Sequence, residues 1–154
     1  MTYVAETPAT TRQRSAALHV TLWTVQVVVG VMFIANGAMK IGSPIDRLIP
    51  MFVWAADVPS ALVRFVGFAE FAGGIGLIVP ALTRTAPWLT PLAGLGLTVL
   101  AFCATLFHAS RGEYVMMPVT LVTGALMGFV AWGRSRRGRI LARSDMRAIG
   151  REER

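Results

Sequence analysis

The stretch Pro59-Ser-Ala-Leu-Val-Arg64-Phe-Val-Gly-Phe-Ala-Glu70-Phe-Ala-Gly-Gly-Ile-Gly-Leu-Ile-Val79 decides the fold, because it is an apolar run that contains an arginine and a glutamate. At about 1.5 Å of rise per residue, a helix of this length crosses a hydrocarbon core of roughly 30 Å. A charged side chain at bilayer depth costs at least about 2.5 kcal/mol on insertion scales, so such residues usually face a protein interior and often mark function.

The composition of the whole chain also indicates a membrane protein. Apolar residues make up 55% of the sequence and charged residues 15%, and the mean hydropathy is +0.59. Apolar windows long enough to cross a bilayer occupy residues 18–39, 59–79, 87–107 and 117–132. These windows are apolar all round, whereas a surface helix of a soluble domain has a polar face. The sequence therefore predicts an all-α fold, a four-helix transmembrane bundle.

The segments outside the windows complete a single membrane domain. Residues 1–17 are rich in Thr and Ala and are expected to form a disordered cytoplasmic lead-in. Residues 18–133 form the predicted four-helix domain, and residues 134–154 form a basic cytoplasmic tail. That tail has no aromatic residue that could stack on bases, so its arginines indicate a topology signal and not a nucleic-acid site.

The distribution of positive charge predicts the orientation. With four spans, both termini share one side with residues 80–86, and that side carries eleven Lys and Arg residues. The other side carries three, namely Lys40, Arg47 and Arg111. Since positive residues accumulate in cytoplasmic segments, both termini are expected to be cytoplasmic.

The long connection between the first two spans is expected to contain a short interfacial helix. Ser43 and Pro44 resemble a helix start, and apolar residues then recur at helical spacing up to Val53. Trp54 would anchor this helix at the headgroup level. The segment is interpreted either as an interfacial connector or as a lid over a site.

Five polar residues are predicted to gather in the outer half of the bundle. Asn36 lies one turn from Lys40 on the same helical face, and His108 ends the third span. Arg64 and Glu70 would lie roughly 8 and 17 Å below the outer end of the second span. No comparable set is apparent in the inner half. The candidate ligand-binding residues are Asn36, Lys40, Arg64, Glu70 and His108.

Each of these residues also has a structural interpretation. Lys40 could extend to the interface, and His108 could cap its helix. Arg64 and Glu70 are six positions apart and point in different directions, so each needs a partner on another helix. A salt bridge between Glu70 and Lys40 or Arg64 would be purely structural. Counting Lys40, Arg64 and Glu70 as charged gives about +1, which favours carbonyl or anionic ligands over cations.

Metal and redox chemistry within the chain itself are disfavoured. Its two histidines, His19 and His108, lie at opposite ends of their spans, so they cannot jointly bind one haem. Cys103 is the only cysteine, so no dithiol motif exists. No metal or catalytic residue and no cofactor is therefore identified.

Small residues at four-residue spacing occur in two of the windows. In the second, Ala69 with Gly73 and Ala72 with Gly76 form two such pairs, and Gly124 with Gly128 forms one in the fourth. This spacing lets helix backbones approach closely, either within one bundle or between two copies of the chain.

Several motifs, taken in order, resemble those of the DoxX and DoxX-like family of small integral membrane proteins. They are Gly30-Val-Met-Phe-Ile-Ala-Asn-Gly-Ala-Met-Lys40, the run from Arg64 to Ile78, a late His108 and Glu113, and Ala131-Trp-Gly-Arg134. The resemblance covers about residues 20–134 and implies a small bacterial inner-membrane protein of four helices. The family is named after subunits linked to quinone-dependent oxidation, including thiosulfate:quinone oxidoreductase.

Two functional hypotheses follow. The first is a non-catalytic accessory subunit with an outer pocket for a quinone headgroup or similar polar ligand, whose electrons come from a redox partner protein. The second is a small proton-coupled transporter that uses Glu70 and could act as a homodimer. Lipid-headgroup binding is a third hypothesis. In the first, a ligand is expected near Arg64 and His108, with Asn36 donating a hydrogen bond.

Overall fold

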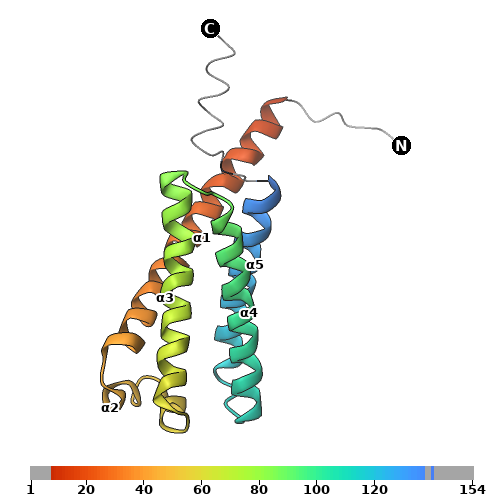
Figure 1. Cartoon of the computed structure of the whole chain (residues 1–154). Coiled ribbons are helices and arrows are strands. Elements are labelled where there is room, and N and C mark those ends of the chain that lie inside the picture. Colours follow the sequence, from red (N-terminus) through yellow and green to blue (C-terminus); the bar gives the residue numbers. More distant parts are fainter. Residues whose placement is uncertain (1–7, 138–139, 141–154) are drawn as a thin grey trace.

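The computed structural model describes residues 8–137 and 140, and this part of the chain contains helices and no strand (Figure 1). Four long helices lie side by side: α1 (Pro8–Gly42), α3 (Ser60–Thr83), α4 (Leu89–Ser110) and α5 (Met117–Trp132). The start of α1, the turn between α3 and α4, and the end of α5 lie at one end, here called the termini end. Residues 43–59 and 111–116 lie at the opposite end, here called the loop end.

Helix α1 is longer than the sequence predicted. It begins at Pro8 and not near residue 18, so residues 8–17 of the expected disordered lead-in are helical. Adding a residue to an existing helix costs little, and Ala, Arg and Gln are good helix formers. Residues 1–7 of that lead-in lie outside the described residues, as do residues 138, 139 and 141–154 of the predicted tail.

Three helices are long and apolar enough to cross a membrane. They are residues Ala16–Gly42 of α1, together with α3 and α4. Their apolar side chains face outward to a large extent; Phe65 and Phe68 are examples. The chain is thus a membrane protein whose helices contact the lipid bilayer. Helix α5 has 16 residues and is shorter than the other three.

The helices associate as two pairs, α1 with α3 and α4 with α5. Glycines allow α1 and α3 to approach closely: a Cβ atom on Gly37 would lie 2.5 Å from the Gly67 carbonyl oxygen, and one on Gly74 would lie 2.7 Å from the Gly30 carbonyl oxygen. Small residues at a membrane helix interface maximise such backbone contact. The small-residue runs of α3 therefore serve packing within the bundle.

The two pairs meet in an apolar core nearer the termini end. Its buried members come from all four long helices: Val29, Phe33, Leu77, Leu97, Met127 and Val130. This core closes that half of the bundle, so any internal space must lie toward the loop end.

The connection between α1 and α3 contains two short helices in place of the single one expected. Helix α2 (Ile45–Leu48) is followed by a 3-10 helix, η1 (Val53–Ala56). Pro50 interrupts the run, and a proline cannot donate a hydrogen bond to an extending helix. Leu48, Ala55 and Val63 form a small buried cluster that holds the connection against α3.

Arg134 differs most from its predicted place in the basic cytoplasmic tail. After α5 the chain continues as a π-helix, η2 (Gly133–Arg137), and the Arg134 side chain is buried. Its Nε donates to Oε1 of buried Gln26 at 2.8 Å, and its guanidinium lies 4.9 Å from the Trp23 ring centre. The termini end thus has a buried polar cluster of its own, contrary to the expectation that only the other half contains one. Its place in a segment with seven other arginines gave no sign of this burial.

Replacing Gly37 by alanine should destabilise the bundle. The new Cβ would lie 2.5 Å from the Gly67 carbonyl oxygen and from the Phe71 nitrogen, and backbone atoms cannot move aside cheaply. The expected cost is about 1–3 kcal/mol, the usual range for overpacking, measured as reversible unfolding in detergent micelles. Gly96→Ala is the matched control, because nothing lies within 4 Å of that position. Equal stability of both variants would contradict the close α1–α3 contact.

Candidate functional site

A cavity of about 760 Å³ lies between the two helix pairs in the loop half of the bundle. Its wall is mainly apolar and includes Phe33, Phe52, Trp54 and Phe107. Ligand sites typically measure about 300–1,000 Å³ and combine an apolar wall with a few polar groups. The polar side chains on this wall are Asn36, Lys40, Glu70, His108, Glu113, Thr120 and Thr123.

Lys40 and Glu70 form an ion pair across the α1–α3 contact. Lys40 Nζ donates to both carboxylate oxygens of Glu70, at 2.7 and 2.6 Å. The side chains are only 5% and 12% exposed, and Lys40 Nζ lies 4.5 Å from the centre of the Phe52 ring. Each charge therefore has its partner, as a charge away from water requires. The structural salt bridge considered from the sequence is present.

Arg64 does not join this pair. Its Nη1 donates to the backbone carbonyl of Lys40, at the end of α1, where helix carbonyls lack intrahelical partners. Arg64 is also not among the residues that line the cavity. The six-residue separation from Glu70 placed the two side chains apart, as expected, and the arginine caps the neighbouring helix.

Asn36 lies near the Lys40–Glu70 ion pair but is not bonded to it. It lies on α1 one turn before Lys40, is half-buried and lines the cavity. Its side-chain amide makes no hydrogen bond to any residue that the structure describes, and its atoms are not enclosed by protein. The amide can therefore both donate a hydrogen bond to a molecule in the cavity and accept one from it.

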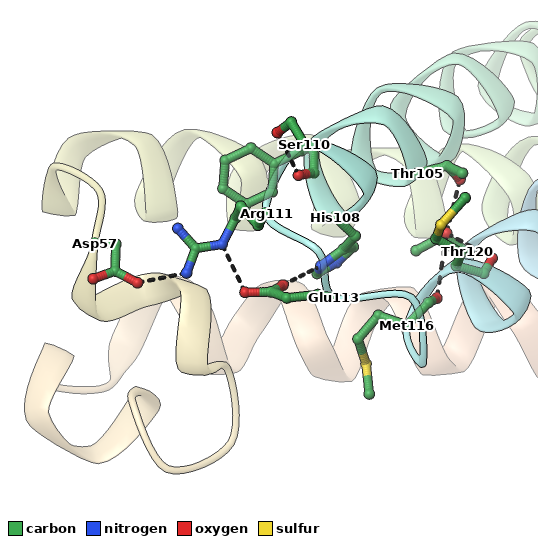
Figure 2. Close-up of polar contacts among 10 residues, drawn as sticks. Asp57, Thr105, His108, Ser110, Arg111, Glu113, Met116 and Thr120 are labelled. Atoms are coloured by element: carbon green, nitrogen blue, oxygen red, sulfur yellow. Dashed lines mark hydrogen bonds and ion pairs between the residues drawn. The ribbon is translucent and has the colours of Figure 1, made fainter.

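His108 is the buried polar side chain that α4 contributes to the cavity wall. Its Nδ1 lies 2.6 Å from Oε2 of Glu113 (Figure 2). The Glu113 backbone N–H donates to the His108 carbonyl oxygen at 2.9 Å. The second ring nitrogen, Nε2, has no hydrogen-bond partner within residues 8–137 and retains accessible surface. The histidine thus has one nitrogen held by protein and one available on a cavity-lining side chain.

Arg111 connects this histidine pair to the other loop. Its Nε donates to Oε1 of Glu113 at 2.6 Å, and its Nη2 donates to Asp57 Oδ2 at 2.5 Å (Figure 2). The hydrogen bond from Arg111, followed by that from His108, lowers the pKa of the Glu113 carboxyl below its ordinary value of 4.5. The Glu113 hydrogen bond in turn raises the pKa of Arg111. Glu113 is therefore an ionised hydrogen-bond acceptor at neutral pH.

Two threonine hydroxyl groups join α4 to α5 about one helical turn before His108. The Thr105 and Thr120 side-chain oxygens lie 2.7 Å apart and connect α4 to α5 (Figure 2). This contact fixes the wall that carries Thr120. Cys103 lies on the same wall and is exposed.

The charge of the cavity differs from the sequence-based sum of about +1. That sum included Arg64, which is not on the wall, and omitted Glu113, which is. Lys40 and Glu70 offset each other, and Arg111 offsets Glu113 from the adjoining loop. The cavity is thus close to neutral, so charge gives no reason to favour an anionic ligand.

The structure separates the five predicted residues into two groups. Lys40, Glu70 and Arg64 are bonded within the protein, whereas Asn36 and His108 retain polar atoms for a ligand. The sequence reasoning did not propose Glu113, Arg111 or Asp57 as site residues. The signal that could have found Glu113 is an acid five residues after a histidine that ends a helix, since the intervening turn brings the two together.

Metal coordination finds no support in the described residues. No group of three or more His, Cys, Asp or Glu side chains there could hold a metal ion. His19 is at the termini end of α1, where its Nε2 accepts from Trp23 Nε1 at 3.1 Å.

The model of the DoxX-like family matches residues 24–130. The match extends from α1 through α5 and includes all five predicted site residues. No curated protein and no solved structure matches the chain.

Removing the charge of Glu70 should destabilise the folded protein. Glu70→Gln leaves the buried Lys40 ammonium without its counter-charge, and we expect a loss of about 1–3 kcal/mol in unfolding free energy, measured in detergent micelles. The double variant Lys40→Met with Glu70→Leu should recover much of that loss, because apolar replacement of both partners removes the unpaired charge. Unchanged stability of Glu70→Gln would show that the pair does not support the fold.

Proposed function

The chain belongs to the DoxX-like family, and from that premise we propose that this small membrane protein binds a neutral, lipid-soluble ligand with a polar ring, such as a quinone headgroup, in its cavity. The observation that carries the proposal is the pair of available polar groups, the Asn36 amide and His108 Nε2, on the wall of an apolar cavity. Such groups, left without a hydrogen bond, favour a ligand that supplies one.

The apolar wall supports the choice of an aromatic or quinone ring. Trp54 packs edge-on against Phe107 with ring centres 6.0 Å apart, and Phe107 contacts the His108 ring at 5.9 Å. Aromatic rings favour such offset or edge-on contacts with other flat rings. Met32 and Leu62 on the wall are also exposed, so an apolar tail could leave toward lipid.

The saturation of the charged pair supports a binding role over proton-coupled transport. A coupling carboxylate must exchange its proton and its partner, whereas Glu70 is held through both oxygens by Lys40. We therefore propose a non-catalytic accessory subunit that presents its ligand to a redox partner protein, which supplies or takes the electrons.

The proposed membrane arrangement has four spans in a bacterial inner membrane. Helix α5 and η2 together run from Met117 to Arg137, which at about 1.5 Å per residue is close to the roughly 30 Å of a hydrocarbon core. The residues between α1 and α3 then lie at the outer surface, with α2 and η1 at the interface.

The orientation predicted from the positive charges can be tested with reporter fusions. With both termini cytoplasmic, a reporter enzyme that is active only in the periplasm should stay inactive when fused after Arg154, and a cytoplasmic reporter should be active there. The same periplasmic reporter inserted after Gly112, in the α4–α5 loop, serves as the matched control and should be active. The reverse pattern would invert the proposed orientation.

Ligand binding can be measured through Cys103, the only cysteine and a cavity-lining residue. In lipid nanodiscs, duroquinone should slow the reaction of Cys103 with N-ethylmaleimide in a saturable manner. Combining Asn36→Leu with His108→Phe should weaken this protection by roughly tenfold to a hundredfold, because two hydrogen bonds of about 1 kcal/mol each are lost.

The control variant moves the cysteine to a lipid-facing position. Val99→Cys in a Cys103→Ser background places the thiol on an exposed part of α4 that is not on the cavity wall. Its labelling should be unaffected by duroquinone. Equal protection at both positions would indicate partitioning into lipid, and protection by phospholipid headgroups but not by duroquinone would favour the lipid-binding alternative.

A further inference from the structure

The His108–Glu113 pair has a consequence for the chemical form of the ligand. Glu113 is held at three points: Oε2 by His108 Nδ1, Oε1 by Arg111 Nε, and its backbone N–H by the His108 carbonyl. These contacts fix the carboxylate relative to the imidazole ring (Figure 2). Arg111 also lowers the pKa of Glu113, so the carboxylate carries no proton to donate.

An ionised carboxylate can only accept hydrogen bonds, which decides the tautomer of the histidine. Nδ1 must carry the proton in the 2.6 Å contact with Glu113. In a neutral imidazole the other nitrogen, Nε2, is then an acceptor. Partners of this kind set histidine tautomers in metal sites and hydrolytic triads alike.

We propose that His108 Nε2 accepts a hydrogen bond from a ligand hydroxyl, so that the cavity binds the reduced, hydroxyl-bearing form of a quinone-type ring more tightly than the oxidised, carbonyl form. This inference rests on the proposed function and specifies the ligand class of the same site. A quinone carbonyl placed against Nε2 would bring two acceptors together, which leaves both unsatisfied.

Asn36 does not oppose this selection. Its amide has both a donor and an acceptor, so it can bind a carbonyl or a hydroxyl by rotating. Lys40, another donor on the wall, is engaged by both oxygens of Glu70, and the Thr120 and Thr123 hydroxyls donate to backbone carbonyls of their own helix. The Trp54 indole N–H, also on the wall, can donate to a carbonyl or to a hydroxyl oxygen, so it favours neither form. The discrimination between the two forms therefore falls on His108, and Glu113 acts as the positioning residue behind it.

The test compares three probes of nearly the same shape on the full chain in nanodiscs, kept anaerobic. The probes are duroquinone, durohydroquinone and the dimethyl ether of durohydroquinone, and the readout is protection of Cys103 from N-ethylmaleimide. At about pH 8, durohydroquinone should bind roughly tenfold more tightly than duroquinone, the equivalent of one net hydrogen bond. The ether has no hydroxyl and should lose that advantage.

Glu113→Gln separates tautomer control from a structural role. Its amide can donate to Nδ1 as well as accept from it, so both tautomers become available and the ratio of the two affinities should fall toward one. Asp57→Asn is the matched control, because it weakens the same loop contact at Arg111 without touching His108. That variant should keep the ratio. His108→Gln provides a second test, because the glutamine amide can donate to the quinone carbonyl or accept from the hydroquinone hydroxyl. The ratio of the two affinities should fall toward one in this variant as well.

The outcomes distinguish the two proposals. Protection by none of the probes would overturn the proposed function itself. Equal protection by duroquinone and durohydroquinone would overturn only the tautomer inference. Tighter binding of duroquinone would overturn it as well, because it would show that Nε2 is a hydrogen-bond donor. Loss of the ratio in Asp57→Asn as well as in Glu113→Gln would assign Glu113 to loop structure alone.

Discussion

The close approach of α1 and α3 is the constraint on which the rest of the structure depends. At Gly37 and Gly67 no side chain separates the two backbones, and a Cβ at either position would lie within 2.6 Å of an atom of the other helix. This contact sets the register that lets Lys40 reach both oxygens of Glu70. It also brings Arg64 to the carbonyl end of α1. The buried charges are thus consequences of helix packing that glycine makes possible.

The two halves of the bundle differ because the helix pairs touch differently along their length. Toward the termini end, side chains such as Leu77, Leu97 and Met127 fill the space between the pairs. Toward the loop end the two helix pairs enclose the cavity. The charged residues there are paired with each other, while Asn36 and His108 are not fully bonded. A nearly neutral, mainly apolar cavity with two available polar groups suits a lipid-soluble ring better than an ion.

The candidate site could be predicted only in outline from the sequence. Helical rise and chain direction placed Asn36, Lys40, Glu70 and His108 at one end, because long apolar helices leave few alternatives for their relative depth. The same reasoning could not assign partners, since these depend on the rotation of each helix about its axis. Arg64 was therefore expected at a ligand and bonds a backbone carbonyl. Arg134 was expected in the basic cytoplasmic tail and is buried against Gln26.

The sequence by itself determined the long apolar helices, their order and the end at which most ionisable groups of the helices gather. Those features follow from hydrophobicity and the fixed rise of a helix, which are local properties of the chain. Only the tertiary structure decided which polar groups are satisfied and which remain available. The tautomer argument for His108 depends on Glu113 reaching Nδ1 and on Arg111 holding that carboxylate. Such contacts arise where loops fold back over helix ends, and no periodic pattern in the sequence encodes that geometry.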